Sequence, residues 1–367
     1  MKVLFACGGT GGHIYPAIAL YHEFVEHDTG ADNAYVFVGS DYGLEKDIFR
    51  AEGIPDYRLI ASRGIARSFS LRTFKSVWCD LIAFSQAKKI VRDLKPDLIV
   101  STGGYPCFHT TYYASKYQIP FFFIEGNVLP GIVVKLFQKR AERIFVSTDL
   151  VRKYLKTDAP IRVTGIPTRQ AVIHRSKTEI VGDLGFVGDK KLVTIIGGSC
   201  GSPELNVAVS GLIKDARLDY QILWATGKKD YQSVRDHIGD IPDHIKVVDY
   251  IDNMPEILSV TDMLVSRSGA LTIQEIKDHH LPAILVPFAK AAENHQYINA
   301  SALVALGAAR MIEEKDLDSA LLRSAIDDVL QNEIALKDAY KNDPAAKSEG
   351  AGEKIYREIM SGMKGNL

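Results

Sequence analysis

The chain has 367 residues, of which 46% are hydrophobic and 24% are charged, with a formal net charge of −1. This composition is typical of a globular protein and excludes collagen-like, low-complexity and disordered classes, and the length predicts two domains. The four cysteines lie far apart without a Cys-x-x-Cys pair, which argues against a structural zinc site and a disulfide framework.

Short apolar runs that end in Gly or Ser alternate with amphipathic stretches. In the first half the predicted strands are 3–6, 35–38, 97–100, 120–124 and 143–146. After Pro167 they are 192–196, 221–224, 245–248, 263–265 and 283–286. β-Rich runs separated by helical patterns predict parallel sheets covered on both faces. We therefore predict an α/β fold of two doubly wound domains, with the boundaries 1–164, 165–345 and a helical tail, 346–367.

The first predicted strand runs into Gly8-Gly9-Thr10-Gly11-Gly12-His13, directly before the helical pattern 14–24. Glycines let the backbone approach a ligand closely, and the following helix start offers unpaired N–H groups to an anion or polar acceptor. The loop lacks the Gly-x-Gly-x-x-Gly dinucleotide fingerprint. It is therefore either a ligand-binding loop or a tight strand–helix turn.

Two further loops follow predicted strands. They are Ser101-Thr-Gly-Gly-Tyr-Pro106 and Gly197-Gly-Ser-Cys-Gly-Ser202. Each alone is consistent with turn chemistry or with ligand contact. Cys200 has no evident paired base, which favours a small polar wall residue over a nucleophile.

The strand 263–265 leads through Ser266-Arg-Ser-Gly269 into a predicted helix start. Backbone N–H groups of Ala270, Leu271 and Thr272 are expected to point at a diphosphate, with the helix dipole behind them. Glu275, a turn further on, is a candidate acceptor for two ribose hydroxyls. The alternative is an ordinary first-turn Glu that interacts favourably with the dipole.

After the strand 283–286, amides and a histidine gather in Glu293-Asn-His-Gln-Tyr-Ile-Asn299. Such a cluster suits recognition of sugar hydroxyls, and a polar helix face is the alternative. The only Asp-x-Asp, Asp316-Leu-Asp318, opens a polar predicted helix and is interpreted as surface, so no metal site and no cofactor are expected. No P-loop, Gly-x-Ser-x-Gly or nucleic-acid motif is present.

Together these loops resemble the MurG family of peptidoglycan N-acetylglucosaminyltransferases, in order and spacing over nearly the whole chain. The resemblance rests on Gly8-Gly-Thr-Gly-Gly-His13, Gly197-Gly-Ser199, Tyr250-Ile-Asp-Asn-Met254, Arg267-Ser-Gly-Ala-Leu-Thr272 with Glu275, and Asn294-His-Gln-Tyr-Ile-Asn299. It implies a GT-B fold, in which two Rossmann-like domains face a cleft. It also implies an inverting transfer of N-acetylglucosamine from UDP-N-acetylglucosamine to lipid I, an undecaprenyl-pyrophosphoryl muramoyl pentapeptide, at the cytoplasmic membrane face. Other cell-wall enzymes are the partners that the family suggests.

The family pattern assigns roles by position. Ile251 is expected to lie against uracil, Ala270, Leu271 and Thr272 to hold the diphosphate, and Glu275 the ribose. Other expected donor-side residues are Thr10, Gly11, Gly12, Asn127, Arg169, Ser199 and Gln296. His13 is the expected base, kept neutral by the helix N-terminus. The expected acceptor-side residues are Gly103, Gly104, Tyr105 and Glu125.

The chain departs from the family pattern at Ile124, Gly126, Ile166 and Cys200. Two of these replace polar residues on the acceptor side, so the acceptor is less well specified than the donor. Three alternatives follow: the same chemistry on another lipid or a secondary metabolite, a UDP-sugar 2-epimerase, or a binding protein without turnover. An epimerase needs further acid/base carboxylates in the donor pocket, and only Glu275 is evident there.

Charge is unevenly distributed along the chain. Residues 1–166 hold 21 Lys/Arg and 16 Asp/Glu, and residues 58–92 hold eight basic residues against Asp80 alone. Apolar residues at helical spacing lie among these cations, namely Phe74, Val77, Trp78, Leu81, Ile82 and Phe84, flanked by Arg63, Arg67, Arg72, Lys75, Lys88, Lys89 and Arg92. The pattern predicts either a core-facing helix stripe or an interfacial patch that binds an anionic membrane surface. The absence of a leader-like N-terminus and of a long apolar run favours a peripheral protein on the cytoplasmic side.

Overall fold

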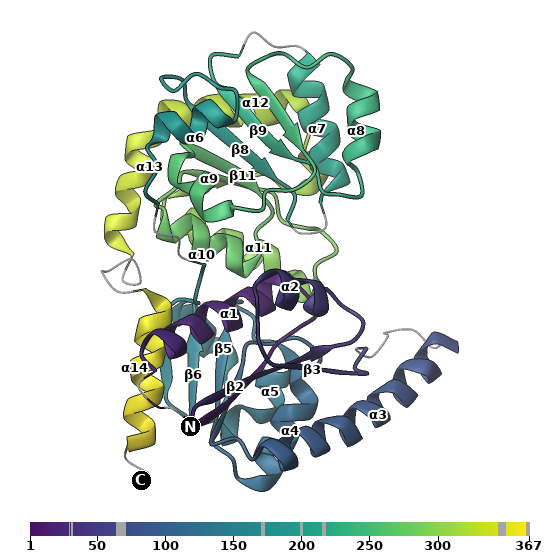
Figure 1. The fold of residues 1–367 in the computed structure, drawn as a ribbon. Coiled ribbons are helices and arrows are strands. Elements are labelled where there is room, and N and C mark those ends of the chain that lie inside the picture. Colours follow the sequence, from purple (N-terminus) through teal and green to yellow (C-terminus); the bar gives the residue numbers. More distant parts are fainter. Residues whose placement is uncertain are drawn as a thin grey trace. The chain divides into compact units, whose positions relative to one another are not determined.

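The structure is a computed structural model that describes residues 1–28, 30, 32–63, 71–169, 173–198, 201–214, 218–343 and 350–364, without the side chains of 71–77 and 364. The chain forms two compact units (Figure 1). Unit 1 comprises 1–169 together with 348–367, and unit 2 comprises 170–347. Most of the predicted tail, 346–367, is thus grouped with unit 1.

Unit 1 is built on a seven-stranded sheet with the order β3-β2-β1-β4-β5-β6-β7, in which every neighbouring pair is parallel. Its strands are β1 (Lys2–Ala6), β2 (Ala34–Ser40), β3 (Tyr57–Ile60), β4 (Leu98–Ser101), β5 (Phe121–Glu125), β6 (Arg143–Val146) and β7 (Ile161–Val163). The central strands consist almost entirely of buried apolar residues, as parallel strands covered on both faces require.

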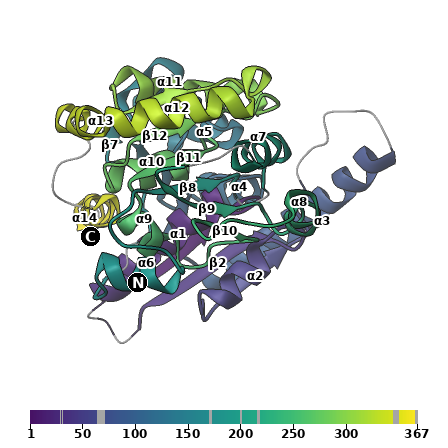
Figure 2. The same ribbon diagram turned by 90° about the horizontal axis from the view of Figure 1, so that it is seen from above.

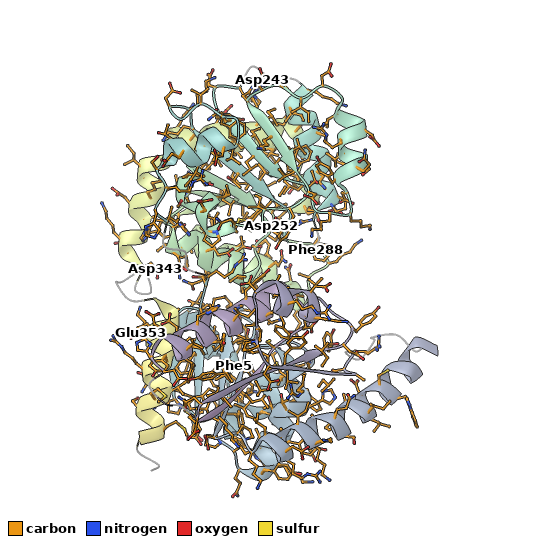
Figure 3. All side chains as sticks on the ribbon, viewed as in Figure 1. Phe5, Asp243, Asp252, Phe288, Asp343 and Glu353 are labelled. Carbon is orange, nitrogen blue, oxygen red and sulfur yellow. The ribbon has the colours of Figure 1, made fainter. Side chains whose placement is uncertain are left out.

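Helices cover both faces of this sheet. The helices of unit 1 are α1 (Gly11–Glu26), α2 (Glu45–Ala51), α3 (Leu71–Leu94), α4 (Cys107–Tyr117), α5 (Ile132–Phe137) and α14 (Ala351–Lys364), with short 3-10 turns η1 (Gln138–Arg140) and η2 (Asp149–Tyr154). On one face Phe5 packs against Phe24 of α1, and Phe37 packs against Phe49 of α2. Figure 3 shows Phe5 in this packed interior. On the other face, α3, α4 and α5 enclose a second core with Leu4 and Ala6.

Unit 2 repeats the plan on a six-stranded parallel sheet with the order β10-β9-β8-β11-β12-β13. Its strands are β8 (Leu192–Ile196), β9 (Gln221–Ala225), β10 (Ile245–Val248), β11 (Met263–Ser266), β12 (Ala283–Leu285) and β13 (Ala309–Met311). Alternate residues of β8 enter opposite cores: Val193 and Ile195 pack with α7, α8 and α12, whereas Leu192 and Ile196 pack with α6, α9, α10 and α11.

The helices of unit 2 are α6 (Lys177–Asp183), α7 (Pro203–Lys214), α8 (Tyr231–Ile238), α9 (Met254–Val260), α10 (Ala270–Asp278), α11 (His295–Ala305), α12 (Ser319–Gln331) and α13 (Glu333–Ala339), with 3-10 turns η3 (Ala292–Asn294), η4 (Glu314–Asp316) and η5 (Tyr340–Asn342). Together the two units confirm the predicted pair of doubly wound parallel sheets.

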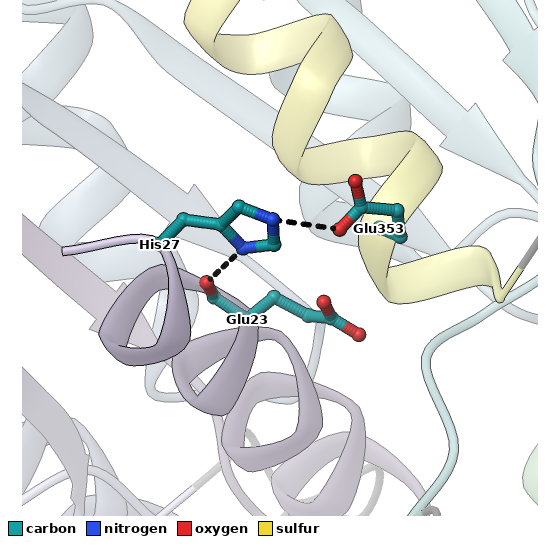
Figure 4. Close-up of side chains that lie close together, drawn as sticks. All are labelled: Glu23, His27 and Glu353. Atoms are coloured by element: carbon teal, nitrogen blue, oxygen red, sulfur yellow. Dashed lines mark hydrogen bonds and ion pairs between the residues drawn. The ribbon is translucent and has the colours of Figure 1, made fainter.

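The last helix, α14, packs along α1 within unit 1. The ring of Tyr356 stacks on His27 at 4.6 Å and meets Phe24 edge-on at 5.0 Å. Beside these rings, Nε2 of His27 lies 3.3 Å from the Glu353 carboxylate, close to Glu23 (Figure 4). Helix α3 extends past the rest of unit 1 (Figure 1 and Figure 2). In the part of the chain that the structure describes, no helix has the length and apolar character needed to cross a membrane.

Candidate functional site

Two glycine loops meet at the carboxyl edge of the unit 1 sheet. They follow β1 and β4, which are adjacent parallel strands. A Cβ on Gly104 would lie 2.0 Å from the carbonyl oxygen of Gly8, and Gly104 has a φ of +90°, so only glycine fits there. The ring of Tyr105 lies against Gly9 in the same way, 3.1 Å from where a Cβ would be. The structure thus brings the first glycine loop together with the predicted acceptor-side residues.

His13 lies in the first turn of α1, above the second loop. A Cβ on Gly103 would lie 2.7 Å from Cδ2 of His13 and 3.0 Å from Nε2, so the imidazole edge rests on this glycine. Nδ1 lies 3.3 Å from Oγ1 of Thr10, the N-cap residue. The hydroxyl of Thr102 donates to the His13 main-chain carbonyl at 2.6 Å. In the tautomer in which Nδ1–H donates to Thr10, the unprotonated ring nitrogen is Nε2.

Glu125 ends β5 and holds the loop that follows it. One carboxylate oxygen accepts the Asn127 N–H at 2.9 Å, and the other accepts the Gly131 N–H at 2.7 Å. Burial raises the pKa of the Glu125 carboxyl, and these N–H donors oppose that effect. The Asn127 side chain also donates to Glu125, at 3.3 Å. The described contacts of Glu125 are therefore those of a loop anchor.

Arg169, predicted to contact a phosphate or sugar, lies in unit 1. Its guanidinium stacks over the ring of Tyr15, with Cζ 4.1 Å from the ring centroid, and lies 3.6 Å from the Glu52 carboxylate. Its Nε is buried without a hydrogen-bond partner among the described residues. The cation is thus held against α1 and α2.

The predicted diphosphate site lies at the carboxyl edge of the unit 2 sheet. Strand β11 is followed by Gly269, which is the N-cap of α10. The first intrahelical bond runs from the Ile273 N–H to the Gly269 carbonyl at 2.9 Å. The N–H groups of Ala270, Leu271 and Thr272 precede that bond, so helix geometry gives them no intrahelical acceptor. Glu275 follows on the next turn and is partly exposed.

The start of α11 borders this helix N-terminus. The hydroxyl of Ser268 donates to the Gln296 main-chain carbonyl at 2.8 Å, and Oε1 of Gln296 accepts the Phe288 N–H at 2.9 Å. Glu293 and Asn294, directly before α11, both have positive φ, a backbone conformation that non-glycine residues rarely adopt. Phe288 and Asp252 lie at this edge of unit 2 (Figure 3).

Ile251, predicted to contact uracil, follows β10 and is 7% exposed within the core that includes α9. Its neighbour Tyr250 has the ammonium of Lys228 5.3 Å from its ring centroid. Ser199 and Cys200 lie outside the described residues. Within the described ranges, the trio of side chains that could hold a metal ion is Glu23, His27 and Glu353, which lies apart from both glycine loops.

Arg267 is a buried residue that had no role in the sequence-based hypothesis. Arg267 is 7% exposed and donates to the carbonyls of Val286 and Pro287, both at 3.3 Å. It also pairs with the carboxylates of Glu204, at 3.0 Å, and Glu314. Arg267 therefore joins the loops after β11 and β12. Its position inside a recognised motif was the available signal, but sequence alone does not separate a structural from a ligand-binding arginine.

Comparison with known proteins gives the family. Profiles of the glycosyltransferase family 28 N-terminal and C-terminal domains match residues 3–146 and 192–355. A UDP-N-acetylglucosamine–N-acetylmuramyl-(pentapeptide) pyrophosphoryl-undecaprenol N-acetylglucosamine transferase from Thermoanaerobacter sp. (strain X514) is 34% identical over 98% of this chain and 100% of its own length. The protein of the same name from Leuconostoc mesenteroides is 36% identical over 98% and 99%. The chain belongs to the MurG family.

A solved structure agrees at the level of the fold. MurG from Acinetobacter baumannii superposes with a TM-score of 0.71 at 20% identity, covering 98% of this chain and 99% of that one. The predicted GT-B fold class and the MurG family resemblance are thus confirmed, and the chain is a glycosyltransferase, as predicted.

Three of the four departures from the MurG pattern, at Ile124, Gly126 and Ile166, lie among the described residues. Ile124 and Ile166 are each 2% exposed, so both pack in the interior of unit 1. The carbonyl of Gly126 accepts the Ser147 hydroxyl at 2.7 Å, which fixes the loop after β5. None of these three departures therefore presents an exposed side chain.

Proposed function

We propose that this chain transfers N-acetylglucosamine, with inversion, from UDP-N-acetylglucosamine to an undecaprenyl-pyrophosphoryl N-acetylmuramyl pentapeptide in peptidoglycan synthesis. The observation that carries the proposal is similarity at 34–36% identity, over nearly the whole chain, to relatives named for this transfer. The two glycine loops of unit 1 and the α10 start of unit 2 are the parts of the chain proposed to supply the chemistry of this transfer.

The donor is proposed to bind at the α10 start. Its diphosphate would accept hydrogen bonds from the Ala270, Leu271 and Thr272 N–H groups, whose alignment with the helix dipole favours an anion. Glu275 would accept from the ribose hydroxyls, and Ile251 would border uracil. Gln296 would reach the sugar. Because Oε1 of Gln296 already accepts the Phe288 N–H, its amide NH₂ is the group expected to face a sugar hydroxyl.

The reaction is proposed as a single displacement. Nε2 of His13 removes the proton from the acceptor hydroxyl as that oxygen attacks C1 of the donor sugar, and the bond from C1 to the UDP oxygen breaks on the opposite face. The charge that develops on UDP is stabilised by the α10 N–H groups. Thr10 would keep Nδ1 protonated, which directs the base function to Nε2.

The lipid acceptor requires a membrane, and α3 offers a surface for it. Trp78, Leu81 and Ile82 are 68%, 59% and 40% exposed, and Lys88, Lys89 and Arg92 follow on the same helix. Phe84, assigned to the same stripe from sequence, instead packs against Phe108 and His109 of α4. The side chains of Arg67, Arg72, Phe74, Lys75 and Val77 lie outside the described residues. We propose that the exposed part of α3 binds an anionic membrane surface peripherally, on the cytoplasmic side.

The test is a transfer assay with purified acceptors. Incubation with UDP-N-acetylglucosamine and lipid I should form lipid II and UDP, whereas UDP-N-acetylglucosamine alone should be recovered unchanged. Formation of the 2-epimer without acceptor would favour an epimerase. Turnover only on another polyprenyl lipid or a secondary metabolite would support the proposed transfer chemistry and show that the acceptor is not lipid I. Saturable UDP binding without turnover on any acceptor would indicate that the protein binds a UDP-sugar but does not transfer it. Other cell-wall enzymes remain the proposed partners.

A further inference from the structure

Glu45 is a fully buried carboxylate beneath the first glycine loop. It is the first residue of α2 and is 0% exposed. Its Oε1 accepts the Gly9 N–H at 2.8 Å and the Ser40 N–H at 3.2 Å. No described residue donates to Oε2, which is also buried. Both hydrogen bonds from described residues to this side chain therefore hold backbone N–H groups, and one of the two holds the glycine loop itself.

Three glycines surround the Glu45 side chain so closely that a Cβ on any of them would collide with it. A Cβ on Gly8 would lie 2.3 Å from Oε1, and a Cβ on Gly43 would lie 2.0 Å from Oε2. Gly39, on β2, would bring its Cβ within 2.7 Å of Cγ. Three glycines thus form a close-fitting pocket for one acidic side chain. A buried carboxylate with only one of its oxygens partnered by the described residues is costly, so its position calls for a reason beyond packing.

The loop that Glu45 holds also carries His13. Gly9 directly precedes Thr10, which is the N-cap of α1 and lies 3.3 Å from Nδ1 of His13. We propose that Glu45 is a positioning residue: by anchoring Gly9 it fixes the Gly8–Gly12 loop, and through Thr10 it fixes the His13 imidazole over Gly103. The inference rests on the proposed function, in which His13 is the base.

Removal of the anchor should release this loop. Without an acceptor, the Gly9 and Ser40 N–H groups would be buried and unpaired, so the loop would shift toward water or another acceptor. A misplacement of about 1 Å at a reacting group can reduce a rate by about 100-fold. UDP affinity should change little, because the residues proposed to hold its uracil, ribose and diphosphate (Ile251, Glu275 and 270–272) lie in unit 2, although the loop also carries the expected donor-side residues Thr10, Gly11 and Gly12.

The experiment compares Glu45→Ala, Glu45→Asp and Glu45→Gln. Asp withdraws the carboxylate by about 1.5 Å yet keeps its charge, so it tests reach even if Ala fails to fold. Both are expected to lower kcat by about 10- to 100-fold, with UDP affinity by calorimetry within twofold of wild type. Gln keeps an oxygen for the two N–H groups and should retain at least about a third of kcat, since no described donor is lost at Oε2. The matched control is Glu333→Gln, a buried carboxylate of unit 2 paired with Lys191 and Lys337, which should leave kcat unchanged.

A double mutant separates positioning from general destabilisation. On a His13→Ala background, Glu45→Asp should lower kcat by less than about twofold, because the group that it positions is gone. If the kcat loss of the double mutant equals the product of the losses in the two single mutants, the inference is overturned. A kcat for Glu45→Asp within threefold of wild type would also overturn it. Wild-type turnover in His13→Ala alone would instead contradict the proposed base. In that case amide exchange at Gly9 decides about Glu45: unchanged exchange in Glu45→Asp would show that it anchors nothing.

Discussion

Glu275 lies one turn into α10, where a carboxylate can accept two hydroxyls of a bound ribose without occupying the N–H groups ahead of it. Glu275→Ala should therefore weaken UDP binding by about 2–4 kcal/mol, the value of two hydrogen bonds to a charged group. The Tm without ligand should stay near wild type, because the residue is partly exposed. Calorimetry with UDP measures the effect, with Asp240→Ala as an exposed acidic control. UDP affinity equal to wild type would remove Glu275 from the site.

The proposed role of His13 as the base predicts that its removal lowers the rate of the chemical step but not the affinity for UDP. His13→Ala should lower kcat by about 10²–10⁴-fold, the usual contribution of a general base, while UDP affinity is retained. His22→Ala, an exposed histidine on the same helix, is the control and should be neutral. Steady-state rates at saturating acceptor give the answer. A loss below about tenfold would make His13 a scaffold residue and place the base elsewhere.

At the residue scale, the sequence predicts positions better than roles. The glycine-rich loops that follow predicted strands were sufficient to point to the carboxyl edges of the two sheets, because such loops form a distinct local sequence pattern. Glu45 and Arg267 were missed as structural anchors, since the atoms they bind belong to backbone far away in sequence. Glu125 was assigned to the acceptor side, whereas its described bonds hold its own loop.

At the scale of elements, the contact between α1 and α14 should depend on pH. Partial burial, followed by the neighbouring Glu353 and Glu26 carboxylates, raises the pKa of Glu23, while His27 lowers it. A carboxyl whose pKa is higher in the folded state favours folding below its unfolded value and loses that contribution as pH rises through the folded value.

Glu23→Gln should therefore strengthen the α14 packing near pH 7.5 and leave it almost unchanged near pH 4.5. The expected gain is about 0.5 kcal/mol, the size of a like-charge repulsion on helix surfaces, so α14 amides should exchange about twofold more slowly. Hydrogen exchange of the α14 amides at each pH, variant against wild type, measures it. Faster exchange in the variant at pH 7.5 would mean that ionised Glu23 stabilises the contact.

The predicted strands were those with a mainly apolar sequence. All ten lie in the two sheets, since buried parallel strands carry a near-continuous apolar run. The strands β3, β7 and β13 were missed. They are short, lie at or next to sheet edges and include Arg58, Arg162 and Arg310, so their hydrophobic pattern is weak and neighbouring strands decide their conformation.

At the scale of the whole molecule, the exposed face of α3 predicts membrane association. The chain should cosediment with anionic vesicles but not with zwitterionic ones, and salt should weaken binding, because each Lys or Arg near such a surface contributes about 1 kcal/mol. Trp78→Ser and the double charge reversal Lys88→Glu/Lys89→Glu should each reduce the bound fraction. Ile334→Ser, 80% exposed on unit 2, is the control and should bind like wild type. Failure to bind either vesicle type at low salt would favour a soluble acceptor.

Unit 1 is completed by α14, although unit 2 lies between them in the sequence. During synthesis the ribosome therefore makes all of unit 2 before it makes the helix that covers α1, and domains usually fold as they emerge. Until then the rings of Phe24 and His27 lack their contacts with Tyr356. The nascent first unit should accordingly be the more chaperone-dependent of the two, and a premature stop codon shortly before residue 351 should harm the unit that is translated first.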